Sequence, residues 1–81
     1  MNNLEKYRKV FRSIFDVEDD VLNENFRFNN VEKWDSVAHM SLISALEDEF
    51  EVLFDTEDIL SYGSFENGIK ILTKYGVKFE E

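Results

Sequence analysis

The stretch from residue 34 to residue 50 carries the apolar pattern that most constrains the fold. The stripe consists of His39 and the apolar residues Leu42, Ile43, Leu46 and Phe50. Their spacing of i, i+3, i+4, i+7 and i+11 describes one face of a helix with 3.6 residues per turn. The pattern therefore predicts an amphipathic helix that packs one side into a core and leaves the other side in water.

The predicted helix begins at the pair Asp35 and Ser36. Either side chain is of a type that caps the free backbone N–H groups of a first helical turn. The Asp35 carboxylate also suits the positive end of the helix dipole. We expect the Ser36 hydroxyl to be exposed and fixed in position, close to backbone groups that favour an attached phosphate.

The rest of the chain predicts a small all-α bundle, formed by a single domain over residues 1–81. A chain of this length buries one small core, and 43% apolar residues favour a packed fold over a disordered tail. The absence of proline and the presence of only three glycines are typical of helices joined by polar loops. We expect three longer helices plus one short helix, with a long loop between the first two helices.

Apolar spacing and capping residues set the expected bounds of these elements. The helices should cover residues 3–15, 36–50, about 57–60 and about 65–75, and the long loop residues 16–33. We predict Thr56 as the cap of the short helix, Ser64 as the cap of the last helix and Gly76 as its end. Gly68 should allow a close helix contact. The predicted anchors of the long loop are Val17, Val21, Leu22, Phe26, Phe28 and Val31.

The negative charge is concentrated in one part of the chain. The net charge is −9, and residues 35–58 contain eight acids and no Lys or Arg. Nucleic acid is therefore disfavoured as a partner, because phosphate binding requires clustered Lys and Arg. Proteins with basic patches are favoured as partners through electrostatic steering. The plain alternative is a solvated helix face with no partner.

The residues alone do not support an autonomous enzyme. His39 follows Ser36 by three residues, which suggests a Ser–His nucleophile pair. However, His39 belongs to the apolar stripe and Ser36 should face solvent. We expect His39 to be partly buried and hydrogen-bonded. The acids at 47–49 fan around their helix, and the acids at 19–20 and 55–58 do not match an EF-hand loop. No metal site is predicted, and no cysteine is present.

The segment around Ser36 resembles the modification site of the acyl carrier proteins. The family pattern is Asp-Ser-Leu followed by a helix ending in a run such as Ala-Leu-Glu-Glu-Glu-Phe. The chain has Asp35-Ser36-Val37 and the run Ala45 to Phe50 at the family's spacing. The resemblance extends over nearly the whole chain in length, acidity and order of elements. Trp34 before the Asp, and His39 after the serine, are more similar to stand-alone carriers of specialised pathways than to fatty-acid carriers.

The resemblance implies a covalent cofactor and a set of partners. A phosphopantetheinyl transferase would attach 4'-phosphopantetheine from coenzyme A to Ser36, and the thiol of the arm would hold an acyl or aminoacyl group as a thioester. Asp35 would belong to the transferase's recognition pattern. Val37, Met40, Glu47 and Asp48 would lie on the helix face shown to the transferase, to an acyl-loading ligase or synthase, and to downstream acyl-transfer enzymes with basic patches.

Two other functions compete with the carrier. One is a small acidic helical module that binds a basic partner and is never modified, and a more distant one is a hydrolase that uses Ser36 and His39. No apolar run approaches the ~18–20 residues of a membrane span and no secretory signal opens the chain, so we expect a cytoplasmic protein. We also expect it to be a monomer.

Overall fold

The computed structural model describes residues 2–79 and contains four α-helices and one short 3₁₀ helix. The helices are α1 (Asn3–Phe15), α2 (Ser36–Phe50), α3 (Thr56–Ser61) and α4 (Phe65–Lys74), and η1 (Asp19–Val21) lies in the loop after α1. The all-α class, the three longer helices, the short helix and the long loop are confirmed. The predicted single domain over residues 1–81 extends beyond the described residues at both ends.

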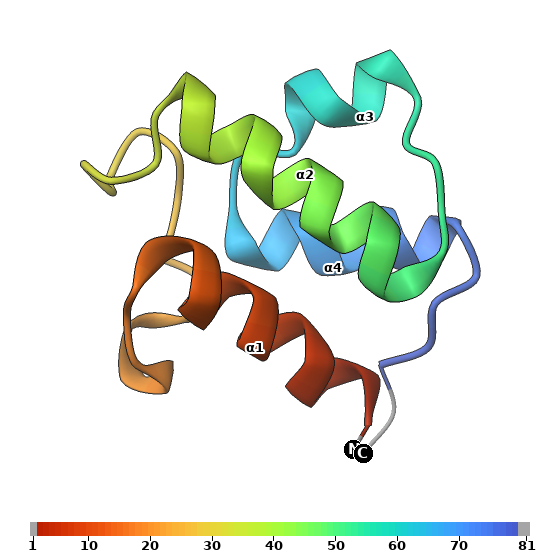
Figure 1. The fold of residues 1–81 in the computed structure, drawn as a ribbon, viewed down its shortest axis with the longest axis horizontal. Helices are drawn as coiled ribbons and strands as arrows, with labels where there is room; N and C mark the ends of the chain where they lie inside the picture. The colour runs from red at the N-terminus through yellow and green to blue at the C-terminus, as the bar shows by residue number, and fades with distance from the viewer. Residues whose placement is uncertain (1, 80–81) are drawn as a thin grey trace.

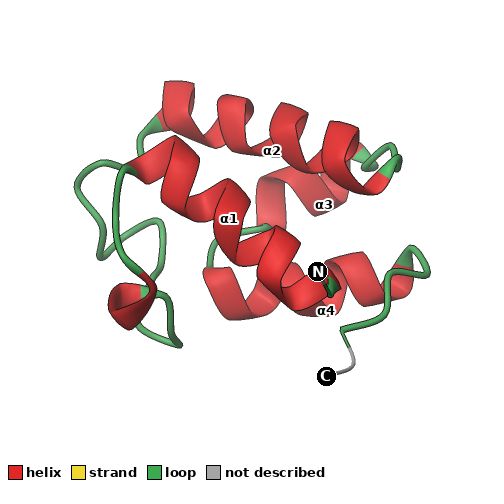
Figure 2. Cartoon of the chain, turned by 60° about the horizontal axis from the view of Figure 1, so that its bottom comes forward, coloured by secondary structure: helices red, strands yellow, loops and turns green. Residues whose placement is uncertain are grey.

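The helices pack around one core, with α3 at its edge. In Figures 1 and 2, α1 and α2 run side by side, α4 lies on the far side of the core from α2, and α3 sits beside α2. Within residues 2–79, no helix combines the length and the apolar character that a membrane crossing requires. The same residues contain no group of three or more His, Asp or Glu placed to hold a metal ion.

The ends of the last two helices test the capping predictions. The Ser64 side chain accepts a hydrogen bond from the Asn67 backbone N–H at 2.9 Å, so its predicted role as the cap of α4 is confirmed. Gly76 follows α4 with a φ of 94°, in the left-handed region that favours glycine. The predicted Thr56 cap of α3 is wrong, because Asp55 occupies the extended cap position and Thr56 is already helical. The Tyr75 hydroxyl accepts a hydrogen bond from the Asp55 N–H at 2.8 Å, which holds Asp55 there.

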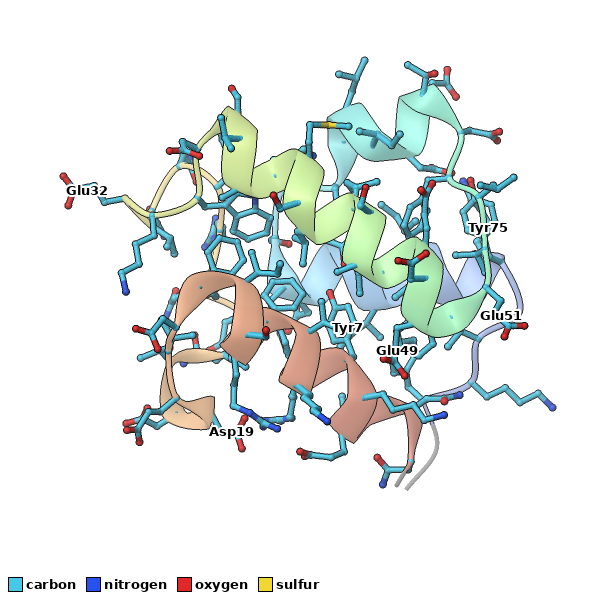
Figure 3. The ribbon with its side chains drawn as sticks, viewed as in Figure 1. Tyr7, Asp19, Glu32, Glu49, Glu51 and Tyr75 are labelled. Atoms are coloured by element: carbon cyan, nitrogen blue, oxygen red, sulfur yellow. The ribbon has the colours of Figure 1, made fainter. Side chains whose placement is uncertain are left out.

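The core is rich in aromatic rings and contains two bonded tyrosine hydroxyls. Tyr7 and Tyr62 share a hydrogen bond of 2.8 Å, and Tyr7 donates to the Phe65 carbonyl at 2.6 Å. Burial raises the pKa of both phenols above the ordinary value, so both stay neutral. Figure 3 shows Tyr7 in the centre of the bundle. Gly68 of α4 packs against both hydroxyls: a Cβ added there would lie 2.1 Å from the Tyr62 oxygen. The close contact predicted at Gly68 is confirmed.

The long loop is held by only some of its predicted anchors. Leu22 and Phe26 are buried in the core, as expected. Val21 and Phe28 are 43% and 45% exposed, so their prediction as buried anchors is wrong. Trp34, at the end of the loop, is buried instead and packs against Phe15 and Phe26 in tilted arrangements, with ring centroids 5.2 and 5.7 Å away.

Helix α3 is tied to the bundle largely by polar side chains. Asp58 is buried and accepts hydrogen bonds from the Lys74 ammonium at 2.7 Å and from the Tyr75 hydroxyl at 2.5 Å. These two hydrogen bonds, that from Lys74 first, lower the pKa of Asp58. Tyr75 lies beside the connection from α2 to α3 (Figure 3). The start of α3 is thereby fixed to the end of α4.

Candidate functional site

Ser36 is the first residue of α2 and is exposed, and its neighbour performs the capping. The Asp35 carboxylate accepts a hydrogen bond from the Ala38 N–H at 2.8 Å, which satisfies one free donor of the first turn. Of the two candidate caps, the structure therefore selects Asp35. Within residues 2–79, the Ser36 hydroxyl forms no hydrogen bond, so it is accessible at the positive end of the helix.

An exposed strip of α2 runs away from Ser36. Val37 is 77% exposed and Met40 53% exposed, so both apolar side chains are accessible to a partner. Ser41, Ser44 and Asp48 continue the strip along the same side of the helix, and all three are exposed. The helix thus presents an apolar end beside Ser36 and an acidic end about three turns further along.

Glu47 is placed differently from the other predicted recognition residues. Its side chain is half-buried, and Oε2 accepts a hydrogen bond from the Phe54 backbone N–H at 3.1 Å. This bond fixes the connection after α2. Glu47 therefore has a structural contact that the sequence pattern did not indicate, whereas Asp48 points freely to solvent.

An apolar groove opens beside Ser36, between the start of α2 and α3. Its volume is about 340 Å³. Its lining residues are Phe28, Ser36, His39, Met40, Ile59, Leu60 and Gly63. Leu60 is 80% exposed on its rim, so much of the apolar lining is in contact with water. A flexible group attached to Ser36 would gain free energy by covering this surface.

His39 forms the inner wall of the groove and is hydrogen-bonded at both ring nitrogens. The Trp34 indole N–H donates to Nδ1 at 3.0 Å, and Nε2 lies 2.8 Å from the Ile59 carbonyl oxygen. The neutral ring with its hydrogen on Nε2 satisfies both contacts. His39 therefore joins the long loop, α2 and α3, and neither nitrogen is free to act on the Ser36 hydroxyl.

The two contacts of His39 predict different outcomes for two substitutions. His39→Gln retains one acceptor and one donor, so we expect a small loss of stability. His39→Leu leaves the indole N–H and the Ile59 carbonyl unpaired, at a cost of about 1–3 kcal/mol for each unsatisfied buried group. Thermal unfolding of both variants measures the difference. Loading of Ser36 by a transferase should survive in His39→Gln, and its disappearance with native circular dichroism would assign His39 a part in the modification.

Comparisons with known proteins find a match among solved structures only. No protein-family model matches the chain, and no curated protein sequence matches it significantly. The chain is similar to the solution NMR structure of the holo acyl carrier protein from Geobacter metallireducens, with a TM-score of 0.76 and 27% sequence identity. The alignment covers 91% of this chain and 85% of the other.

The fold and the aligned region define a four-helix carrier domain with a long first loop. The chain is thus similar in fold, over most of its length, to an acyl carrier protein.

Proposed function

We propose that the protein is an acyl or aminoacyl carrier, acting as one domain over residues 1–81, in which Ser36 bears 4'-phosphopantetheine. The observation that carries the proposal is that the cap and the free hydroxyl at the start of α2 belong to two different residues. Asp35 caps the helix, so the adjacent Ser36 hydroxyl is exposed and not engaged. A serine that served only as a cap would use its side chain on the backbone.

The residues around Ser36 suit an attached phosphodiester and a long flexible arm. Backbone N–H groups of the first turn of α2 stabilise negative charge at this position. The apolar groove lined by Phe28, Met40 and Leu60 begins at Ser36 and offers the arm a surface to lie on. When bound, the group supplies a terminal thiol that holds the cargo as a thioester; the chain itself contains no cysteine. The similarity to a holo acyl carrier protein supports the same assignment.

The proposed partners recognise Asp35 and the exposed strip of α2. They are a phosphopantetheinyl transferase, an acyl-loading ligase or synthase, and downstream transfer enzymes, in a specialised biosynthetic pathway. Val37 and Met40 offer apolar contacts beside Ser36, and Asp48 offers a negative charge. We place Glu47 at the edge of this surface, since its carboxylate is bonded to Phe54.

The exposed apolar side chains of Val37, Met40 and Leu60 also fit an unmodified interaction module. The mass of the intact protein separates the two functions after incubation with coenzyme A, Mg²⁺ and a transferase of broad specificity. A single gain equal to phosphopantetheine supports the carrier. A folded protein whose mass does not change supports the module.

The exposed strip of α2, which contains Asp48, gives a prediction about the rate at which the transferase associates with the chain. We expect Asp48→Lys to slow modification by the transferase about 2- to 10-fold at low salt, a small part of the 10–10³-fold range of electrostatic steering. The deficit should shrink as salt rises, because exposed charges are screened beyond ~8 Å at physiological ionic strength. Initial rates measured across a salt series test this.

The matched control for this experiment is Asp20→Lys. Asp20 is also exposed and lies in η1, and its replacement by Lys changes the net charge by the same amount. We expect Asp20→Lys to slow the transferase reaction much less than Asp48→Lys does. Equal rates for the two variants would show that α2 has no special role in attracting the transferase.

A further inference from the structure

A second hollow adjoins the groove at Ser36. It lies between the long loop and the turn from α3 to α4, with a volume of about 400 Å³. Its polar lining residues are Arg27, Asn29, Ser61, Ser64 and Asn67. Phe28 and Gly63 line both this hollow and the groove, so the two are adjacent, and we call them together the trough.

The backbone on both sides of the trough is fixed. The Phe28 N–H donates to the Gly63 carbonyl at 2.8 Å, and the Phe65 N–H donates to the Phe26 carbonyl at 2.9 Å. Arg27 lies between these two hydrogen bonds and is paired with Ser64 in a single antiparallel bridge. Gly63, with a φ of 61°, contributes no side chain that would block the passage. Arg27 is thus held in place although it belongs to a loop.

Arg27 supplies the positive charge of the trough. Its Nε donates to the Glu24 carbonyl at 3.1 Å, and no carboxylate among residues 2–79 forms an ion pair with its guanidinium. Among residues 2–79, no acidic residue lines either hollow. The neighbouring Asn67 amide is already committed to the Ser61 and Tyr62 carbonyls, at 2.9 and 3.0 Å. The terminal nitrogens of Arg27 are therefore still available as donors to a ligand.

We propose that Arg27 binds a free carboxylate at the far end of the cargo, so that the carrier favours acyl groups that end in an acid. This inference rests on the proposed attachment of phosphopantetheine at Ser36. The arm and the acyl chain would lie along Phe28, Met40 and Leu60, and the carboxylate would meet the guanidinium in the polar hollow. A guanidinium fork matches a carboxylate in a bidentate, charge-assisted pair. A neutral acyl chain of equal length gains no such pair.

The test compares two cargoes of equal length on the full chain. A broad-specificity transferase attaches the arm from glutaryl-coenzyme A or from pentanoyl-coenzyme A, and intact mass verifies each product. Amide ¹H–¹⁵N spectra of the two products are then compared. We expect the two cargoes to differ most at Asn29, Ser64 and Asn67. The difference should vanish in Arg27→Gln and persist in Lys70→Gln, which removes an exposed charge of α4 outside the trough.

The outcomes separate this inference from the proposed function. No mass gain from either donor on a folded protein contradicts the carrier function itself. Loaded products with identical spectra at the hollow overturn only the carboxylate site, and this comparison needs no variant. A difference that survives in a folded Arg27→Gln variant also overturns it, because the carboxylate then binds elsewhere.

Discussion

Ser36→Ala is expected to abolish modification by the transferase and to leave the fold intact. The hydroxyl is the proposed point of attachment, and alanine offers no nucleophile in its place. Because Asp35 provides the cap of α2, the variant should change stability by no more than about 0.5 kcal/mol, as at other exposed sites. Intact mass after incubation with coenzyme A, together with thermal unfolding, measures both effects.

Two other serines of α2 provide the controls for this prediction. Ser41 and Ser44 are exposed on the same helix, so Ser41→Ala and Ser44→Ala should be modified like the parent. Ser64 is a poor alternative site, since its hydroxyl accepts the capping bond of α4. Modification that persists in Ser36→Ala would place the arm on one of these serines.

Gly68→Ala is expected to destabilise the bundle by about 1–5 kcal/mol. The new Cβ would lie 2.1 Å from the Tyr62 hydroxyl oxygen and 2.2 Å from that of Tyr7, far inside contact distance. Overpacking costs about 1–3 kcal/mol, and separating the two buried hydroxyls adds about 1–3 kcal/mol. The better helix propensity of alanine returns only about 1 kcal/mol. In a domain of this size, each kcal/mol lowers the melting temperature by roughly 4–8 °C.

The steric origin of this loss can be separated from a general intolerance of alanine. Gly76→Ala serves as the control, because a Cβ there meets nothing within 4 Å and only its φ of 94° is unfavourable. Combining Gly68→Ala with Tyr7→Phe removes one of the clashing oxygens, so the pair should be less destabilised than the sum of the two single changes. A Gly68→Ala protein as stable as the parent would contradict the close packing of α4 on the two tyrosines.

The sequence predicted α1, α2 and α4 well because each of them has a clear local signal. The apolar spacing defined α1 and α2, and Ser64 and Gly76 marked the ends of α4. The position of Trp34 in the core could not be predicted in this way. It depends on which of several apolar side chains in an irregular loop reaches the interior, and the loop has no periodicity to decide between Trp34 and Phe28.

The site was predictable as a serine at a helix start, but its surroundings were not. Asp35 and Ser36 are both capping types, so only the geometry distinguished the cap from the free hydroxyl. The groove combines side chains from the long loop, α2, α3 and the turn after α3, which are far apart in the sequence. Likewise, the hydrogen bond from the Phe54 N–H to the Glu47 carboxylate could not be predicted, because its donor is a backbone group that every residue except proline has.

Mapping the added mass to a single residue tests the central claim most directly. The purified protein is incubated with coenzyme A, Mg²⁺ and a broad-specificity transferase, then digested and sequenced by tandem mass spectrometry. We predict one phosphopantetheine per chain, located on Ser36. A folded protein that gains no mass, or one that carries the group on another residue, would contradict the proposal that Ser36 is the attachment site of an acyl carrier.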